Sequence, residues 1–149
     1  MGKCLIFCAG GFDSLAEPIT PEDVIVAADT IVVCDGRVLG KPANEAEAVS
    51  MLTLLSGRSH QVMTGLTLRR GDRLLSHTEV TQVHFRPLDP QEILDYVRSG
   101  DPMDKAGSYG IQSGGAKFAH RLEGDYFNVV GLPVCRLSLL LKQIMEEDL

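Results

Sequence analysis

The feature that most constrains the fold of this chain is an unbroken apolar run, residues 24–28, which ends in the polar pair Asp29-Thr30. Such a run, rich in β-branched residues, is typical of a strand that is covered on both faces. A second apolar stretch, 31–34, continues it, and Asp35-Gly36 signals a turn. Because a carboxylate and a hydroxyl in a buried strand must be hydrogen-bonded or used by a ligand, Asp29 and Thr30 are candidate functional residues.

Strand and helix patterns interleave along the rest of the chain. The further segments with strand patterns are 3–8, 61–69 and 74–86. Helices are expected after the capping residues Asn44 and Asp89 and from Pro133 onward, whereas 101–133 is glycine-rich and irregular. Because the elements interleave without strict βαβ alternation, they predict an α/β fold with a mixed twisted sheet and flanking helices.

Composition restricts the class of protein. The chain has 149 residues, 44% apolar and 23% charged, with a formal net charge of −6. The length fits a single domain, 1–149, and no apolar stretch approaches the roughly 20 residues of a membrane span. A net acidic chain is a poor partner for nucleic acid, but it can bind a small phosphorylated ligand through a few local cations. The four cysteines form no zinc or disulfide pattern, which favours reduced thiols and a cytoplasmic protein.

Polar, glycine-punctuated segments lie at the ends of the expected elements. They are 28–30 with 40–42, then 104–112, and 123–133. A carboxylate that leaves a buried strand can orient water or bind a metal, and a lysine on a Gly-Pro loop can bind a phosphate oxygen. Each feature also has an ordinary explanation, as a turn residue or a solvated surface charge. The residues alone therefore indicate no more than a cleft for a phosphorylated ligand.

Some other prominent side chains are interpreted as structural. Arg58 and His60 are expected to order a turn between a helix and a strand, and Tyr126 and Phe127 are expected in the core. The leucine stripe of the last helix fits either a core face or a dimer face.

Four segments carry a resemblance to a protein family: VIVAADTIVVCDGRVLGKP, LLSGRSHQVMTGL, DPMDKAGSYGIQ and EGDYFNVVGLPV. Together they resemble the Maf family of nucleoside triphosphate pyrophosphatases, also called septum formation proteins, from about residue 23 to about residue 141. The resemblance implies a two-lobed architecture like that of the inosine triphosphatases, with a nucleotide in the central cleft. It also implies hydrolysis of a nucleoside triphosphate to the monophosphate and pyrophosphate, a divalent cation (Mg²⁺ or Mn²⁺) as cofactor, and a homodimer.

The matching positions take the family's catalytic roles by resemblance. Asp29 is expected to be the catalytic proton acceptor that activates water, and Lys41 the catalytic residue that binds phosphate. Lys105 is expected to bind substrate, and Asp104 is expected to contribute to metal binding.

Substrate choice is expected from two further positions. Thr30 and Gln112 match the branch of the family that acts on dTTP and UTP. A glutamine offers both a donor and an acceptor, which suits the edge of a base. By resemblance, these two residues select pyrimidine nucleotides.

By comparison with the family, we expect the N-terminal part, about 1–22, to be shortened. The family's opening strand leads into a Ser-x-x-Arg-Arg loop, but residues 9–14 read AGGFDS, without arginine and with the negative charge of Asp13. Losing positioned groups that donate hydrogen bonds to phosphate oxygens lowers the turnover rate steeply. Two hypotheses follow: a pyrophosphatase that hydrolyses dTTP or UTP, or a catalytically silent or truncated Maf-like domain that serves as a nucleotide-binding or protein-interaction module.

Overall fold

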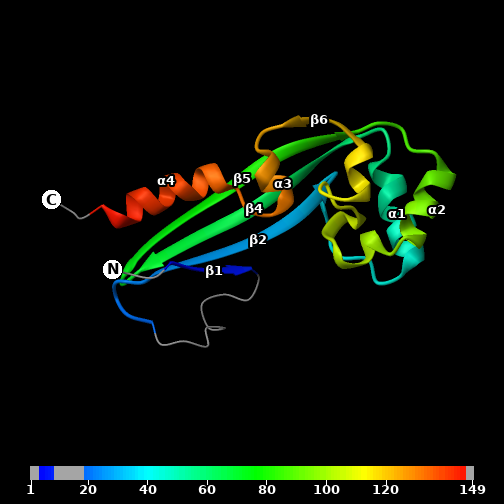
Figure 1. Ribbon diagram of the computed structural model, residues 1–149. Helices are drawn as coiled ribbons and strands as arrows, with labels where there is room; N and C mark the ends of the chain where they lie inside the picture. The colour runs from blue at the N-terminus through cyan, green and yellow to red at the C-terminus, as the bar shows by residue number, and fades with distance from the viewer. Residues whose placement is uncertain (1–3, 9–18, 147–149) are drawn as a thin grey trace.

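The computed structural model describes residues 4–8 and 19–146 of the chain (Figure 1). Its strands are β1 (Cys4–Cys8), β2 (Val24–Cys34), β3 (Arg37–Leu39), β4 (Ser59–Arg70), β5 (Arg73–Phe85) and β6 (Ala119–Glu123). Its helices are α1 (Glu45–Leu55), α2 (Pro90–Arg98), α3 (Tyr126–Val130) and α4 (Val134–Met145), with short 3₁₀ turns η2 (Asp101–Asp104), η3 (Ala106–Ser108) and η4 (Gly114–Lys117). The expectations for the loop 9–14 and for Asp13 lie outside the described residues.

A single sheet carries the described fold. Its strand order is β1-β2-β4-β5-β6, and β3 pairs with β2 beside this path. β1 and β2 run parallel, whereas the other described pairs are antiparallel. The β4–β5 hairpin pairs from Arg70 with Arg73 to Ser59 with His84, and together with β2 it extends across the molecule (Figure 1). The predicted α/β fold with a mixed sheet is confirmed.

Helices cover this long sheet in two separate places. α4 lies along one half of the long strands, and α1 and α2 gather at the other end (Figure 1). The two groups form separate clusters of buried apolar residues. β2 contributes to both, because Ala28 belongs to the cluster under α4 and Val32 to the cluster around α1 and α2. The expected two-lobed architecture is confirmed, and Asp29 and Thr30 lie on β2 between the two clusters.

The predicted helix starts are confirmed by their hydrogen bonds. The Asn44 side chain accepts from the Glu47 amide at 2.8 Å at the start of α1. Asp89 forms a complete capping box with Glu92 at the start of α2. The expectation that 101–133 is irregular is wrong for β6 and α3, which are too short to give a periodic pattern. Within the described residues, no helix is long and apolar enough to cross a membrane.

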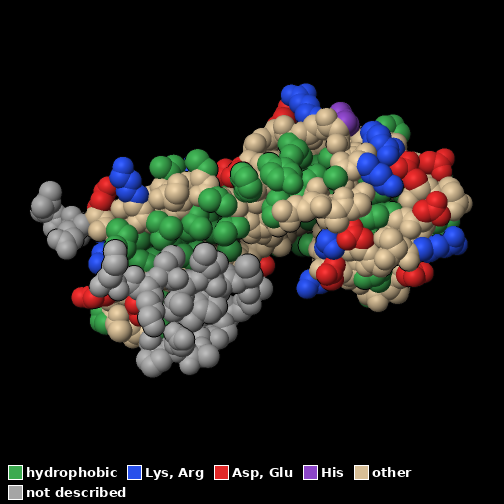
Figure 2. All heavy atoms as spheres, in the orientation of Figure 1, with side chains coloured by type: hydrophobic (Ala, Val, Ile, Leu, Met, Phe, Trp, Pro, Cys, Tyr) green, Lys and Arg blue, Asp and Glu red, His purple; other side chains and the backbone are tan. Residues whose placement is uncertain are grey.

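The expected burial of Tyr126 and Phe127 is wrong. Their exposed fractions are 42% and 55%, and Figure 2 shows apolar side chains at the surface over α3. The short helix instead turns Asn128 toward the sheet, where this side chain is fully buried. Its Nδ2 donates to the Val62 carbonyl at 3.1 Å and to the Thr81 hydroxyl at 3.0 Å. A buried amide thus holds α3 on β4 and β5, and the aromatic residues face outward.

Candidate active site

A cavity of about 500 Å³ lies between the two lobes. Its walls come from five separate parts of the chain: β2, the loop after β3, Val62 on β4, the segment 105–113 and the segment 129–131. Five of the six residues expected at the site line it: Asp29, Thr30, Lys41, Lys105 and Gln112. Asp104 is not among the lining residues.

Asp29 lies on β2 in the wall of the cavity, between Ala28 and Thr30, which also line it. Ala28 is buried, whereas Asp29 is exposed. Its partner across the β2–β4 ladder is Gly65, and an added Cβ on that glycine would meet nothing within 4 Å. The strand therefore leaves open space beside the carboxylate. Among the described residues, the Asp29 carboxylate has no hydrogen-bond or ion-pair partner, so its oxygens are available to a ligand.

Lys41 is brought to the same cavity by a backbone contact between two loops. The carbonyl of the preceding Gly40 accepts a hydrogen bond from the Gly107 amide at 3.1 Å. This bond fixes the Lys41 loop against the segment 105–113. The Lys41 ammonium forms no ion pair within the described part of the chain, so it can bind an anion.

Thr30 lies in the cavity wall, but its hydroxyl is engaged by the protein. Its Oγ1 lies 2.9 Å from the Thr64 Oγ1 and donates to the Gly131 carbonyl at 3.3 Å. Gly131 ends α3 and is itself part of the wall. The hydroxyl of Thr30 therefore fixes the position of the segment 129–131 relative to β2.

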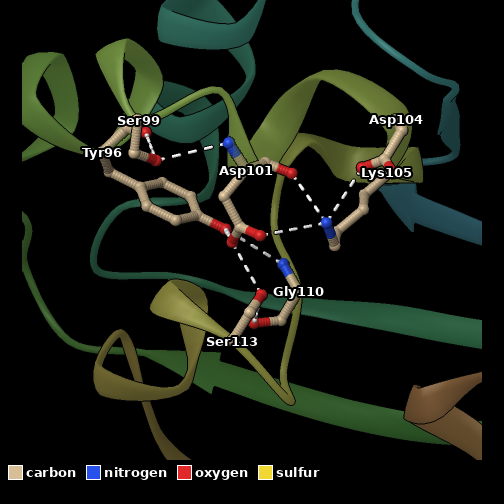
Figure 3. Close-up of polar contacts among 7 residues, drawn as sticks. All are labelled: Tyr96, Ser99, Asp101, Asp104, Lys105, Gly110 and Ser113. Atoms are coloured by element: carbon tan, nitrogen blue, oxygen red, sulfur yellow. Dashed lines mark hydrogen bonds and ion pairs between the residues drawn. The ribbon is translucent and has the colours of Figure 1, made fainter.

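The segment 105–113 is held by a polar network around Asp101 (Figure 3). The Asp101 Oδ2 accepts from the Tyr96 hydroxyl and from the Ser113 hydroxyl, both at 2.6 Å. The same Tyr96 hydroxyl accepts from the Gly110 amide at 3.1 Å. Partial burial opposes ionisation of Asp101, but hydrogen bonds from Ser113, Tyr96 and Lys105 outweigh it and lower its pKa to about 2. The carboxylate is therefore ionised at neutral pH, and it ties both ends of the segment to α2.

Lys105, which was expected to bind substrate, lines the cavity, but its ammonium is engaged by protein acceptors. Its Nζ donates to the Asp101 carbonyl at 2.7 Å, to the Asp101 Oδ1 at 3.1 Å and to the Asp104 Oδ1 at 2.9 Å (Figure 3). All three ammonium protons have protein acceptors. The hydrogen bond to Asp104 raises the pKa of Lys105, and Lys105 in turn lowers the pKa of Asp104. A phosphate can reach this ammonium only by sharing or replacing one of these acceptors.

Asp104 is placed as a partner of Lys105 rather than as part of a metal cluster. Its side chain is 81% exposed. The described residues contain no group of three or more His, Cys, Asp or Glu side chains that could hold a metal ion. Mg²⁺ in phosphoryl-transfer sites is commonly held by one or two carboxylates together with substrate phosphates. Asp29, with its open carboxylate in the cavity, fits a metal of that kind.

Tight backbone geometry shapes the same segment. Gly107 has φ +73°, and a Cβ there would lie 2.9 Å from a Val32 methyl carbon. A Cβ on Gly110 would lie 2.4 Å from the Ser113 Oγ and 2.7 Å from the Lys105 Cε. These glycines allow the segment to approach β2 and to fold over Lys105.

Beneath the cavity, Tyr109 and His60 form a buried pair. The His60 Nε2 lies 2.6 Å from the Tyr109 hydroxyl. Burial, with a smaller contribution from the charge of His84, lowers the pKa of His60 from its usual 6.5 to about 4, so the imidazole is neutral at pH 7. His60 was expected to order a turn, and its contact with a cavity residue was not predicted. Tyr96, Asp101 and Ser113 were also missed, because nothing in their spacing marks them as a cluster.

The sequence profile of one family, described as "Maf-like protein", matches residues 8–144 of this chain. The chain belongs to the Maf family. Its relatives in that family include a dTTP/UTP pyrophosphatase of Symbiobacterium thermophilum, 55% identical over 123 residues, and one of Syntrophomonas wolfei, 55% identical over 116 residues. A dTTP/UTP pyrophosphatase of Bacillus pumilus is 48% identical over 124 residues.

This Maf chain matches only part of these relatives. The aligned regions cover 83%, 76% and 83% of the chain, but 63%, 61% and 66% of the three relatives in the same order. The chain thus spans less than two thirds of the length of these proteins. The family is established over most of the sequence, whereas the activity of the longer relatives is carried over to this chain only as a proposal.

Proposed function

We propose that this chain is a nucleoside triphosphate pyrophosphatase that hydrolyses dTTP or UTP to the monophosphate and pyrophosphate. The observation that carries the proposal is one cavity lined by Asp29, Lys41 and Gln112. Within residues 4–8 and 19–146, the carboxylate and the ammonium have no side-chain partner, and the carboxamide is exposed. The names of relatives at 48–55% identity support the same reaction.

Asp29 is the proton acceptor in this reaction. Attack on the α-phosphorus needs a water molecule held in line and a base that takes its proton as the new P–O bond forms. The Asp29 carboxylate opens into the cavity and has no protein partner among the described residues. A positioned base of this kind contributes about 10²–10⁴-fold to the rate.

Lys41 and Lys105 provide the cationic part of the site. The loose transition state of phosphoryl transfer places negative charge on the phosphate oxygens and the leaving pyrophosphate. Lys41 is free to contact these oxygens, whereas Lys105 must first exchange a carboxylate for a phosphate. A divalent cation, Mg²⁺ or Mn²⁺, would be held by one Asp29 oxygen together with substrate oxygens, which leaves the other Asp29 oxygen to accept the proton. When bound, the cation would neutralise charge on the phosphates.

Gln112 recognises the base in this proposal. Uracil and thymine carry an N–H between two carbonyl groups. A carboxamide can accept a hydrogen bond from this N–H and donate one to a carbonyl oxygen beside it. Gln112 is exposed in the cavity and has no hydrogen-bond partner in the described part of the chain. Thr30 acts on specificity indirectly, because its hydroxyl fixes the wall 129–131 through Gly131.

The second candidate function is a catalytically silent Maf-like domain that serves as a nucleotide-binding or protein-interaction module, and the observation behind it is the absence of arginine from residues 9–14. Two further properties are part of the main proposal. We expect a homodimer, from the family resemblance, and a cytoplasmic location, where nucleoside triphosphates and reduced thiols such as Cys34 and Cys135 occur together.

Pyrophosphate release from a panel of nucleoside triphosphates, with Mg²⁺ or Mn²⁺, tests the proposal. We compare wild type, Asp29→Asn, and Asp72→Asn as a matched control at the exposed tip of the β4–β5 hairpin. The expected result is release from UTP and dTTP by wild type and by Asp72→Asn, and a loss of about 10²-fold or more in Asp29→Asn. If wild type releases no more than Asp29→Asn while still binding UTP, the silent-domain function replaces the enzyme.

A further inference from the structure

His60 and Tyr109 form a buried pair next to the cavity, and Tyr109 also lines it. Their exposed fractions are 2% and 6%, and Tyr109 is part of the cavity wall. Both rings pack edge-on against Phe85, with centroid separations of 4.9 Å and 4.8 Å. The hydrogen bond of 2.6 Å between the Nε2 and the hydroxyl therefore lies in an aromatic environment.

Stability alone gives a weak reason for a polar pair at this place. Burying an imidazole and a hydroxyl costs desolvation, which one hydrogen bond only partly offsets. The His60 Nδ1 is buried and has no hydrogen-bond partner among the described residues. Two apolar rings would fill the space without that cost. The pair instead orients the Tyr109 side chain, because the hydrogen bond holds its hydroxyl at one point on β4.

The segment around Tyr109 needs such an anchor. Gly107 and Ser108 both have left-handed backbone conformations, with φ +73° and +64°. This conformation is strained in Ser108, because its Cβ lies close to the backbone there. Directly after this bend, the chain passes Tyr109 and Gly110 and reaches Gln112. The Gly110 amide is held from the other side by the Tyr96 hydroxyl. Tyr109 is therefore the only side chain of 105–113 that ties the bend to β4 by a described hydrogen bond.

We propose that His60 is a positioning residue that acts through its hydrogen bond to Tyr109, and that this buried pair fixes the segment 105–113 so that Gln112 selects the base. The pair does not touch the reacting atoms. Its effect appears mainly as substrate preference, because a displaced carboxamide loses its match to the pyrimidine edge while Asp29, on β2, keeps its position. The identity of the ligand rests on the proposed function; the anchoring of the segment does not.

Removing the hydroxyl tests the anchor directly. Tyr109→Phe is compared with Tyr126→Phe, which removes a hydroxyl from an exposed tyrosine that does not line the cavity. Hydrogen exchange of the backbone amides of 105–113 is measured first, because it requires neither substrate nor metal. We expect faster exchange in Tyr109→Phe and no change in Tyr126→Phe. Unchanged exchange in Tyr109→Phe overturns the proposal.

Substrate preference tests whether the anchor acts through Gln112. The ratio of kcat/KM for UTP to that for ATP should fall roughly tenfold in Tyr109→Phe, since small misplacements of a positioning group cost one to two powers of ten. Gln112→Ala should lower the same ratio, and adding Tyr109→Phe to Gln112→Ala should lower it no further. Independent, additive losses in the double variant would contradict the proposal, as would a lower melting temperature with an unchanged ratio.

Variants of His60 separate positioning from packing. His60→Leu removes the hydrogen bond and should behave like Tyr109→Phe, whereas His60→Gln keeps a polar group near the Nε2 position and should restore part of the preference. Equal loss in His60→Leu and His60→Gln would overturn the role assigned to the hydrogen bond. If wild type releases no pyrophosphate from any triphosphate, the proposed function fails by itself. The exchange data, and the relative binding of UMP and AMP, then still decide whether the pair positions the segment.

Discussion

Acid should destabilise this protein through His60 in particular. The imidazole is 2% exposed, and burial lowers its pKa from 6.5 to about 4. The unfolded chain therefore binds a proton below pH 6.5 that the folded chain does not bind until about pH 4. In that window the free energy of unfolding falls as pH falls, by at most about 1.4 kcal/mol per pH unit. Between pH 7.5 and pH 4.5, His60 should account for about 2.5 kcal/mol of lost stability.

Urea unfolding at pH 7.5 and at pH 4.5 measures this loss. Other groups also titrate in this range, so the informative quantity is the difference between wild type and His60→Gln, whose side chain does not titrate. Wild type should lose about 2.5 kcal/mol more than the variant on acidification. A difference below about 0.5 kcal/mol would refute the reasoning, because it would mean that folded His60 accepts a proton as readily as the unfolded chain does.

Other expected outcomes concern the walls of the cavity. Asn128→Ala should lower the free energy of unfolding by about 2–3 kcal/mol in urea unfolding, since it removes a fully buried amide whose two N–H groups lie within hydrogen-bond distance of three acceptors; a loss below about 1 kcal/mol would contradict this. Asp104→Asn should lower the KM for UTP roughly two- to fivefold in steady-state assays, because an exposed carboxylate no longer competes with phosphate for Lys105; an unchanged or raised KM would count against it. Gly107→Ala should lower the melting temperature more than Gly40→Ala, because only the first has a positive φ and a close neighbour; equal shifts would argue against strain.

The sequence predicted the parts of the fold that are set by local patterns. The run 24–28 indicated a buried strand, and β2 carries those residues inside the sheet. The capping residues Asn44 and Asp89 marked the starts of α1 and α2 because their hydrogen bonds are made within a few residues. Asp29 was found in the same way, as a carboxylate that interrupts an apolar strand.

The contacts between distant residues could not be predicted in this way. The Asp101 network joins α2 to Gly110 and Ser113. No periodic pattern in the sequence marks these residues as neighbours. α3 has five residues, which are too few for a helical pattern. The sequence therefore could not predict that Asn128 is buried and Phe127 is exposed. The roles of Asp29, Lys41 and Gln112 came from the family resemblance and stay predictions until variants are measured.

The charges around the cavity bear on how a triphosphate would bind. Two ammonium groups, Lys41 and Lys105, face three carboxylates, Asp29, Asp101 and Asp104, in the described part of the chain. Because the carboxylates of Asp101 and Asp104 already pair with Lys105, the free cationic charge is essentially that of Lys41. A highly charged triphosphate would meet net repulsion at such a site unless other charges compensate. A divalent cation bound to the nucleotide removes most of that repulsion and gives the Asp29 carboxylate a favourable partner. If the proposed function holds, the charge arrangement of the described residues favours a metal–nucleotide complex over the free nucleotide as the substrate.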